Sequence, residues 1–495
     1  MNDEVVTMKI SLEEIQRVAN QGPFYPDWDS LATYQVPNWF KRAKFGIFIH
    51  WGLYSIPAFG SEWYSRNMYI QGTAEFDHHI KTYGPHKDFG YKDFIPLFTA
   101  ENFHADEWLR IFKEAGAQYI FPVAEHHDGF QLYASQLSPF NSAKMGPKRD
   151  ILGELSQAAQ REQVHFCTSS HRAEHHFFFS HGKEFTSDIA SEVSLEELYW
   201  PAMPEPDHHD LFGQPYPSQE FLDDWLLRTC ELVRDYQPEI LYFDWWIQHA
   251  AFKEHMKLFA AYYYNLGAAF GKPTSICYKH DALAFGSGIV EVERGGFAEI
   301  QPFTWQTDTA IARNSWGYTE NLDYKSTKEI IQTLIDVVSK NGNLLLNIGP
   351  KGDGAIPEKD QEILREIGAW LQVNGQAIYD SRAWRQFGEG PTQVDSGPFS
   401  DGKNIPYTNQ DFRFTAKGGA VYAFLMEPAA NQWLTIQALA DERENPASRF
   451  HGIIEEVSLL GYDEALEWEQ MPQGLRLFMP SVAADLPLVV KVQLR

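Results

Sequence analysis

Short apolar runs recur along the first three quarters of the chain, and segments with helical patterns separate them. Several runs are apolar at every position, which is typical of strands covered on both faces in a parallel sheet. The runs span residues 45–52, 119–126, 164–171, 240–247, 274–281, 288–295, 303–309 and 343–350. The pattern therefore predicts eight strands of one parallel sheet.

The segments between these runs carry apolar residues at helical spacing. The segment 218–236 has one apolar stripe, and Ser326 and Glu329 form a capping box before a second helix that Gly342 is expected to end. Strands alternating with helices predict an α/β fold, a (β/α)8-like (TIM-type) barrel. The connection between the fifth and sixth strands is too short for a regular helix, so the barrel should be irregular there.

Beyond residue 380 the pattern changes to short alternating strands without helices between them. The run 412–426 contains a Gly-Gly turn, and further alternating runs follow it. Such a pattern predicts a C-terminal β-sandwich. We therefore expect two domains, a catalytic (β/α)8-like barrel with an N-terminal extension over residues 1–380 and a β-sandwich over residues 381–495.

Composition and charge exclude several classes of function. Hydrophobic residues make up 44% of the 495 residues, enough for a folded protein with a sizeable core. The formal charge of −26, without a basic cluster in the sequence, argues against nucleic acid and anionic membranes as partners. Aromatic residues make up 15% of the chain. The simpler explanation is a well-filled core; the other is a binding site for a ligand with flat apolar faces, such as a sugar.

Cysteine usage and the N-terminus bear on the compartment. The cysteines Cys167, Cys230 and Cys277 are too few and too scattered for a disulfide framework, so we expect buried thiols. The sequence contains neither a signal-peptide pattern at its start nor an apolar stretch long enough to cross a membrane. We expect a soluble protein with the cytoplasm favoured; an exported mature form stays open, because a removed signal peptide would leave the same sequence.

Ionisable and aromatic residues cluster where the predicted strands end. Barrel enzymes carry out their chemistry at the carboxyl ends of the strands, so these residues should meet at one rim. They are His50, Trp51, Glu62, Trp63, His126, His127, Asp128, His171, Asp244, Trp245, Trp246, Lys279, Glu291, Glu293, Gln306 and Asp308. Each has a structural explanation when taken alone, such as helix capping by Asp244, but their convergence favours a functional site.

Two reaction classes suit such a rim. In the first, two carboxylates about 5–5.5 Å apart cleave a glycosidic bond with retention, while the other side chains bind the sugar. In the second, His50, His126, His127 and His171 hold a metal ion together with Asp244, as in barrel metallohydrolases. Adjacent histidines on a strand point to opposite faces, which argues against one ion bound by His126 and His127. We therefore expect no metal and no cofactor.

Several longer motifs resemble one known family. They are WFKRAKFGIFIHWGLYSIPAFGSEWYSRNMY at 39–69, HHDGF at 126–130, KRDILGEL at 148–155, NSWGY at 314–318 and NGNLLLNIGPKGDGAIP at 341–357. Together with the strand that leads to Asp244, they resemble glycoside hydrolase family 29, the α-L-fucosidases. The resemblance implies a (β/α)8-like catalytic domain followed by a β-sandwich, a retaining mechanism and no metal.

The resemblance also implies roles for individual residues. Asp244 matches the family's nucleophile, which would form a covalent glycosyl-enzyme. The residues that match its contacts to the fucose hydroxyls and methyl face are His50, Glu62, Trp63, His126 and His127. Lys279 matches a basic residue that would keep the nucleophile ionised by lowering its pKa. Tyr242 and Trp305 complete the expected substrate-binding set as aromatic residues near the rim.

The acid/base residue lies in a stretch where the family varies. Glu291 and Glu293 are two residues apart, so on a strand they share a face and either could reach the rim. Glu293 is the first choice because it immediately precedes Arg294 and a Gly-Gly turn at the strand end. Glu291 is the alternative acid/base, and Glu299 is a third candidate.

These observations predict a retaining exo-α-L-fucosidase that removes terminal α-L-fucosyl residues from oligosaccharides or glycoconjugates. The expected partner is a fucosylated oligosaccharide substrate, and a homo-oligomer is left open. Three alternatives remain. An α-L-galactosidase on the same scaffold would act on a sugar that differs by one hydroxyl at C6. A metal-dependent barrel hydrolase and a fucose-binding protein without enzymatic activity belong to other classes.

Overall fold

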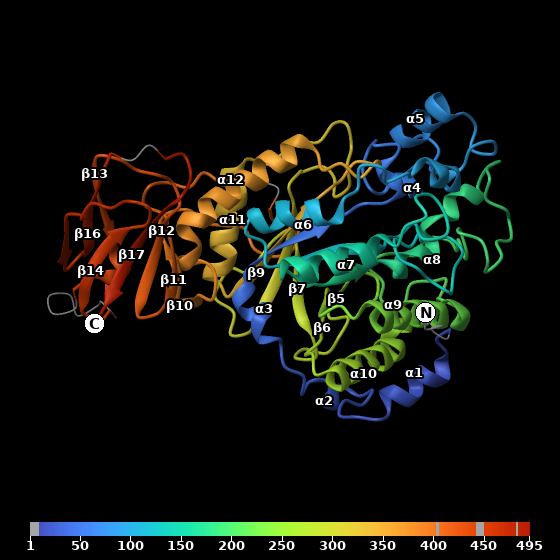
Figure 1. Ribbon diagram of the computed structural model, residues 1–495, viewed down its shortest axis with the longest axis horizontal. Helices are drawn as coiled ribbons and strands as arrows, with labels where there is room; N and C mark the ends of the chain where they lie inside the picture. Colours follow the sequence, from blue (N-terminus) through green and yellow to red (C-terminus); the bar gives the residue numbers. More distant parts are fainter. Residues whose placement is uncertain (1–8, 402–404, 442–449, 482–483) are drawn as a thin grey trace, which may run out of the picture.

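A closed barrel of parallel strands forms the larger part of the molecule (Figure 1). The computed structural model describes residues 9–401, 405–441, 450–481 and 484–495. The barrel strands are β1 (Phe45–Ile49), β2 (Tyr119–Glu125), β3 (His165–Phe166), β4 (Thr168–Ser170), β5 (Ile240–Phe243), β6 (Ser275–Tyr278), β7 (Ile289–Glu293), β8 (Trp305–Ala310) and β9 (Gly342–Ile348). The ring closes because β1 pairs with both β2 and β9. All of these pairings are parallel, so the carboxyl ends of the strands meet at one end of the barrel.

The predicted strands and the predicted irregularity are confirmed. Each of the apolar runs forms a strand, and only the run 164–171 is interrupted, at Cys167, where β3 gives way to β4. The described residues 279–288, which connect β6 to β7, contain turns and bends but no helix. The same holds for the described residues 294–304 between β7 and β8. One side of the barrel therefore presents loops where a regular barrel presents helices.

Helices cover the outside of the barrel (Figure 1). The helices of the described residues are α1 (Leu12–Ala19), α2 (Trp28–Leu31), α3 (Asn38–Ala43), α4 (Tyr64–Asn67), α5 (Ala74–Tyr83), α6 (Ala105–Glu114), α7 (Ile151–Glu162), α8 (His175–Phe178), α9 (Gln219–Tyr236), α10 (Lys253–Phe270), α11 (Thr327–Ser339) and α12 (Glu358–Asn374). The predicted capping box begins α11: Ser326 Oγ accepts a hydrogen bond from Glu329 N at 3.2 Å, and Glu329 Oε2 accepts one from Ser326 N at 2.8 Å.

The expectation that Gly342 ends this helix is wrong. The helix stops at Ser339, and Asn341 takes the left-handed conformation, with φ at 73°, that turns the chain into β9. Gly342 is the first residue of β9, and a Cβ at this position would lie 2.7 Å from the Trp305 ring. Glycine is therefore required there for packing against the indole, and not for ending the helix.

Two antiparallel sheets make up the C-terminal part, as predicted. One sheet has the order β10-β11-β12-β17-β14 and the other the order β13-β16-β15. Their bounds are β10 (Arg382–Glu389), β11 (Phe412–Lys417), β12 (Ala420–Leu425), β13 (Gln432–Ile436), β14 (Ile454–Leu459), β15 (Trp468–Met471), β16 (Gly474–Met479) and β17 (Leu488–Leu494). Side chains of both sheets, such as Phe414 and Leu477, share one core. Helix α11 packs against β10 and β11 and so joins the sandwich to the barrel (Figure 1).

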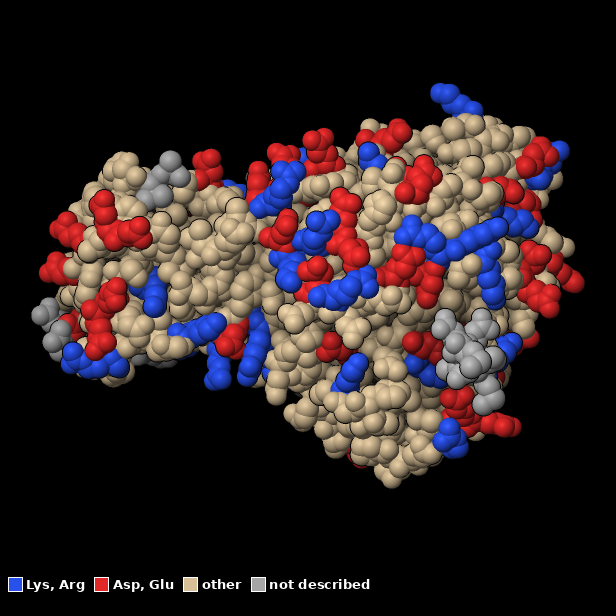
Figure 2. Space-filling view, in the orientation of Figure 1, with Lys and Arg blue, Asp and Glu red and all other residues tan. Residues whose placement is uncertain are grey.

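Charged side chains of both signs lie on the visible face of the molecule (Figure 2). On the face shown in Figure 2, Lys and Arg side chains are interspersed among the Asp and Glu side chains. Within the described residues, every helix is either too short or too polar to cross a lipid bilayer.

Candidate active site

A pocket of about 600 Å³ opens at the carboxyl ends of the barrel strands. Its walls come from strand ends, from the loops that follow them, and from one residue of the C-terminal part. The lining residues are Phe48, His50, Glu62, Trp63, His126, His127, His171, His208, His209, Leu211, Tyr242, Asp244, Trp245, Gln248, Lys279, His280, Glu293, Asp308, Trp316 and Phe399. The pocket thus gathers His50, Glu62, Trp63, His126, His127, Tyr242, Asp244, Lys279 and Glu293 from the residues expected at the rim.

One lysine joins the two carboxylates at the centre of this pocket. Lys279 Nζ lies 2.9 Å from Asp244 Oδ1 and 2.6 Å from Glu293 Oε2. The two carboxylate oxygens are therefore at most about 5.5 Å apart, a separation that suits a retaining glycosidase and leaves too little room for the water of an inverting one. Asp244 directly follows β5, Lys279 directly follows β6, and Glu293 is the last residue of β7.

The surroundings drive the pKa values of the two carboxyl groups in opposite directions. Burial alone would raise the pKa of Asp244, but Lys279 and His171 outweigh it and hold this pKa well below its usual range. Burial raises the pKa of Glu293 to about 7, although Lys279 opposes the rise. An ionised carboxylate thus lies beside a carboxyl group that is able to donate a proton near neutral pH, which is the division of roles that glycoside hydrolysis needs.

Histidines contact the candidate nucleophile, Asp244, and line the floor of the pocket. His171 Nδ1 donates a hydrogen bond to Asp244 Oδ2 at 2.8 Å. His50 Nδ1 donates to Asn347 Oδ1 at 2.6 Å, and burial lowers the His50 pKa well below its usual value, so its Nε2 is able to accept a hydrogen bond. Burial also lowers the pKa of His127 to about 3. Neutral His50 and His127 are suited to accept hydrogen bonds from sugar hydroxyls.

Glu62 and Trp63 form one wall of the pocket together with Trp316, which comes from a distant part of the sequence. Glu62 Oε2 accepts hydrogen bonds from Trp316 N at 2.9 Å and from Ser315 Oγ at 3.2 Å, so the carboxylate fixes the loop after β8. The Trp316 ring contacts the His50 ring with 5.3 Å between centroids, and the Arg294 guanidinium lies 4.5 Å from the Trp316 ring centroid. Trp63 and Trp316 thereby offer two indole faces to a ligand.

Three of the expected site residues lie outside the pocket. Trp305 is the first residue of β8, at the opposite end of the barrel, where its Nε1 donates a hydrogen bond to Lys340 O at 3.0 Å. The expected role of Trp305 in substrate binding is therefore corrected. Glu291 points into the barrel core, and its Oε2 accepts a hydrogen bond from Gln306 Nε2 at 2.9 Å. Glu299 is also absent from the pocket lining in the described residues.

The argument that His126 and His127 must point to opposite faces is wrong as well. β2 ends at Glu125, so both histidines belong to the turn that follows it, and both line the pocket. Among the described residues, two groups of side chains lie close enough together to hold a metal ion: His50, His126 and His171 form one, and His127, His171 and Asp244 the other, each with ligand atoms within 4.8 Å of one another. In the second group, the Asp244 carboxylate already accepts hydrogen bonds from the Lys279 ammonium and from the His171 N–H. These donors occupy the oxygens that would have to bind a metal ion.

Sequence reasoning placed Asp308 at the rim without giving it a role, and it missed Phe399. Asp308 on β8 is buried, accepts a hydrogen bond from Tyr242 OH at 2.7 Å and lies 3.9 Å from Lys279 Nζ. Phe399 comes from the segment before β11, and its N donates to Glu293 O at 2.8 Å. The position of Asp308 near the end of the predicted strand 303–309 indicates a rim residue, whereas nothing in the local sequence distinguishes Phe399 from other loop aromatics.

The barrel and its lysine-linked carboxylates define the class of a barrel glycoside hydrolase. More narrowly, the chain belongs to the α-L-fucosidase family: the model described as alpha-L-fucosidase matches residues 11–376, and that of the alpha-L-fucosidase C-terminal domain matches residues 404–492. Plasma alpha-L-fucosidase of Homo sapiens is 32% identical over 483 residues, covering 93% of this chain and 89% of the relative. Tissue alpha-L-fucosidase of Homo sapiens is 30% identical, covering 95% and 91%. The Thermotoga maritima alpha-fucosidase structure in complex with fucose has a TM-score of 0.72 at 30% identity, covering 95% of this chain and 100% of that one.

Proposed function

We propose that this protein is a retaining exo-α-L-fucosidase that hydrolyses terminal α-L-fucosyl residues of oligosaccharides or glycoconjugates. The observation that carries the proposal is the contact of Lys279 with both Asp244 and Glu293, which limits the carboxylate separation to the retaining range. Membership in the α-L-fucosidase family supports the choice of sugar.

The reaction runs in two displacements. Asp244 attacks C1 of the fucosyl unit and forms a covalent ester, while the bond from C1 to the leaving oxygen breaks and Glu293 gives that oxygen its proton. Glu293, now a carboxylate, then takes a proton from water, whose oxygen attacks C1 and frees Asp244. The opposed pKa shifts of Asp244 and Glu293 support these roles.

The remaining pocket residues bind the sugar. His50, His127 and Glu62 offer acceptors for the fucosyl hydroxyls, and Trp63 and Trp316 cover its apolar face and C5 methyl group. His126 and Tyr242 complete the floor; the Tyr242 hydroxyl is directed at Asp308, so its contribution is the ring face. Lys279 keeps Asp244 ionised and is itself kept cationic, since three nearby carboxyl groups outweigh the effect of burial and raise its pKa.

Phe399 extends the pocket on the leaving-group side. Its backbone is tied to Glu293, and its side chain is 64% exposed, so the ring is free to contact the sugar that follows fucose. We further propose that residues 1–380 form the catalytic domain and residues 381–495 the second domain, which would then contribute Phe399 to the site. The start of β10 at Arg382 supports this division.

Hydrolysis of 4-nitrophenyl α-L-fucoside, followed by proton NMR, tests the proposal. The first-formed product should be α-L-fucose. The β-anomer would contradict a retaining mechanism, and fucose binding without release of nitrophenol would favour the non-enzyme alternative. The α-L-galactoside should react more slowly, because the indole wall that suits a methyl group must accept a hydroxymethyl group.

Membership in the α-L-fucosidase family does not favour the metal-dependent alternative, although two histidine-containing groups of the described pocket could hold an ion. Treatment with EDTA separates the two candidates. Full activity after removal of divalent metals supports the carboxylate mechanism, whereas loss of activity that zinc restores would support the metal mechanism.

A further inference from the structure

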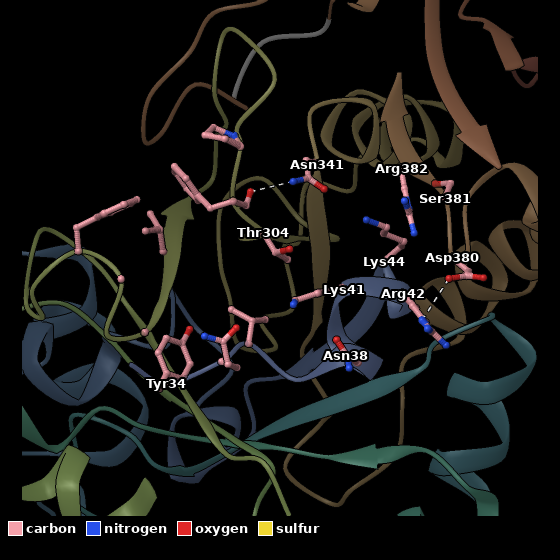
Figure 3. A pocket seen from close by; sticks show the side chains of 18 of the residues that line it. Tyr34, Asn38, Lys41, Arg42, Lys44, Thr304, Asn341, Asp380, Ser381 and Arg382 are labelled. Atoms are coloured by element: carbon pink, nitrogen blue, oxygen red, sulfur yellow. Dashed lines mark hydrogen bonds and ion pairs between the residues drawn. The ribbon is translucent and has the colours of Figure 1, made fainter. Parts of the chain in front are cut away.

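A second cavity, of about 650 Å³, lies at the opposite end of the barrel (Figure 3). It is formed where β1, β7, β8 and β9 begin and where the chain enters β10, and we call it the amino-end pocket. None of its lining residues belongs to the lining of the carboxyl-end pocket. It is therefore a separate site, and the proposed hydrolysis does not use it.

Positive charge dominates the amino-end pocket, although the chain carries a formal charge of −26. Its charged lining residues are Lys41, Arg42, Lys44, Arg382 and a single acid, Asp380. Asp380 is engaged by Arg42, whose Nε lies 3.4 Å from Asp380 Oδ1 (Figure 3). Within the described part of the chain, no ion pair or hydrogen bond engages the charged group of Lys41, Lys44 or Arg382.

Lys44 is the strongest sign of a missing ligand. The residue is 1% exposed, since it sits between α3 and β1, and its side chain extends beside that of Arg382 toward the cavity (Figure 3). Burial lowers the pKa of Lys44 to about 8, with Asp380 opposing the shift, so the ammonium remains protonated at neutral pH. Within the described residues only the longer-range attraction of Asp380 offsets the burial of this ammonium, and an anion in the cavity would supply a direct partner.

The rest of the lining defines the kind of anion. Val36, Val290, Pro302, Phe285 and Phe303 form an apolar wall, and Phe285 is 67% exposed. The volume lies in the range of small-molecule sites, and cationic groups beside an apolar wall suit an organic ligand with an anionic head.

We propose that the amino-end pocket binds a small organic ester of phosphate or sulfate, with its oxyanion held by Lys44, Lys41 and Arg382 and its apolar part against Phe285 and Phe303. Phosphate and sulfate monoesters present the same tetrahedral oxygens, and Arg382 supplies the planar donor pair that binds them.

Calorimetric titration of the full chain tests the proposal, with phenyl phosphate, phenyl sulfate and inorganic phosphate at constant ionic strength. Saturable binding to one site is expected, with the phenyl esters binding more tightly than inorganic phosphate. The affinities of phenyl phosphate and phenyl sulfate are compared, and the ester that binds more tightly identifies the preferred oxyanion. Equal affinity for phenyl phosphate and inorganic phosphate would overturn the organic part of the proposal, and absence of saturable binding for all three would overturn it altogether.

Matched variants locate the site. Lys44→Met and Arg382→Gln should each weaken phenyl phosphate binding at least tenfold, whereas Lys81→Met, at an exposed lysine on α5, should leave it unchanged. Unchanged affinity in Lys44→Met would overturn the assignment. A double variant, Lys41→Gln with Arg382→Gln, changes only exposed residues and provides the same test if Lys44→Met fails to fold.

Discussion

Glu291 and Glu293 lie on the same face of β7, but they occupy different layers of the barrel. Glu291 pairs in register with Gln306 and accepts a hydrogen bond from its amide, in the closed interior. Glu293, one layer nearer to the carboxyl end, pairs with Asp308 and contacts Lys279 in the pocket. The layering of side chains inside a barrel thus separates two carboxyl groups that the sequence makes equivalent.

Replacement of Glu291 by Gln should leave turnover of α-L-fucosides well above the level expected for loss of a general acid, which costs about 10²–10⁴-fold. Burial raises the pKa of Glu291 well above its usual value. Above pH 4.5 the unfolded chain ionises this group while the folded chain does not, so the native state loses stability as pH rises. Glu291→Gln should therefore raise the melting temperature at pH 7 and change it little at pH 4. A large loss of activity would make Glu291 the acid/base.

Glu293→Ala should slow hydrolysis of natural fucosides by about 10²–10⁴-fold and affect aryl fucosides with good leaving groups much less. The reason is that a good leaving group departs without a proton. Added azide or formate should restore the rate on aryl substrates by taking the place of the missing carboxylate. Rescue in Glu291→Ala but not in Glu293→Ala would reverse the assignment.

The pH dependence of kcat/KM reports the same pair. Glu293 must be protonated to act as an acid, and its pKa is about 7, so the rate should fall as pH rises through about 7. Asp244 must be ionised, and its pKa lies well below its usual range, so the acidic limb should lie at a lower pH than an ordinary aspartate would give. Glu293→Gln should abolish the limb near pH 7. Persistence of that limb in the variant would assign it to another group.

Much of this site could be predicted because it depends on features local in the sequence. Each apolar run became a barrel strand, and parallel strands bring their carboxyl ends together, so Asp244 and Lys279 were predictable as neighbours. The error at Trp305 has a related cause. The sequence pattern suggests a place near the rim for this residue, but Trp305 begins β8, and the first residue of a parallel strand lies at the end opposite to the site.

Long-range packing accounts for what could not be predicted. Phe399 reaches the pocket because the segment after β10 docks on the loop after β7, where Gly397 pairs with Gly296 and Asp401 N donates to Arg294 O at 2.9 Å. No periodicity reports such a contact between residues about 100 positions apart. Lys44 lines a second cavity, and this position is likewise a property of the assembled barrel and not of the motif that contains the residue.

Lys279→Met removes the cation that lies between the carboxylates. Because Lys279 lowers the pKa of both Asp244 and Glu293, both limbs of the pH profile should move to higher pH. Removal of one partner from a buried ion pair costs about 3–5 kcal/mol, so urea unfolding at pH 7 should show a large loss of stability. Lys359→Met, at an exposed lysine that pairs with Glu362, is the control and should change little. Unmoved limbs would show that Lys279 does not set these pKa values.

Phe399→Ala tests whether the C-terminal part contributes to substrate selection. The ring is 64% exposed beside Glu293, and covering it with the sugar next to fucose should stabilise the complex by about 1.4 kcal/mol, or tenfold in affinity. The KM for fucosylated oligosaccharides should therefore rise about tenfold, while fucosyl fluoride, whose leaving group is too small to reach the ring, should react as before. Phe285→Ala, at an exposed phenylalanine of the amino-end pocket, is the matched control and should leave both substrates unaffected. An equal loss on both substrates would mean that Phe399 supports Glu293 through the backbone contact, and an unchanged KM would remove Phe399 from the binding site.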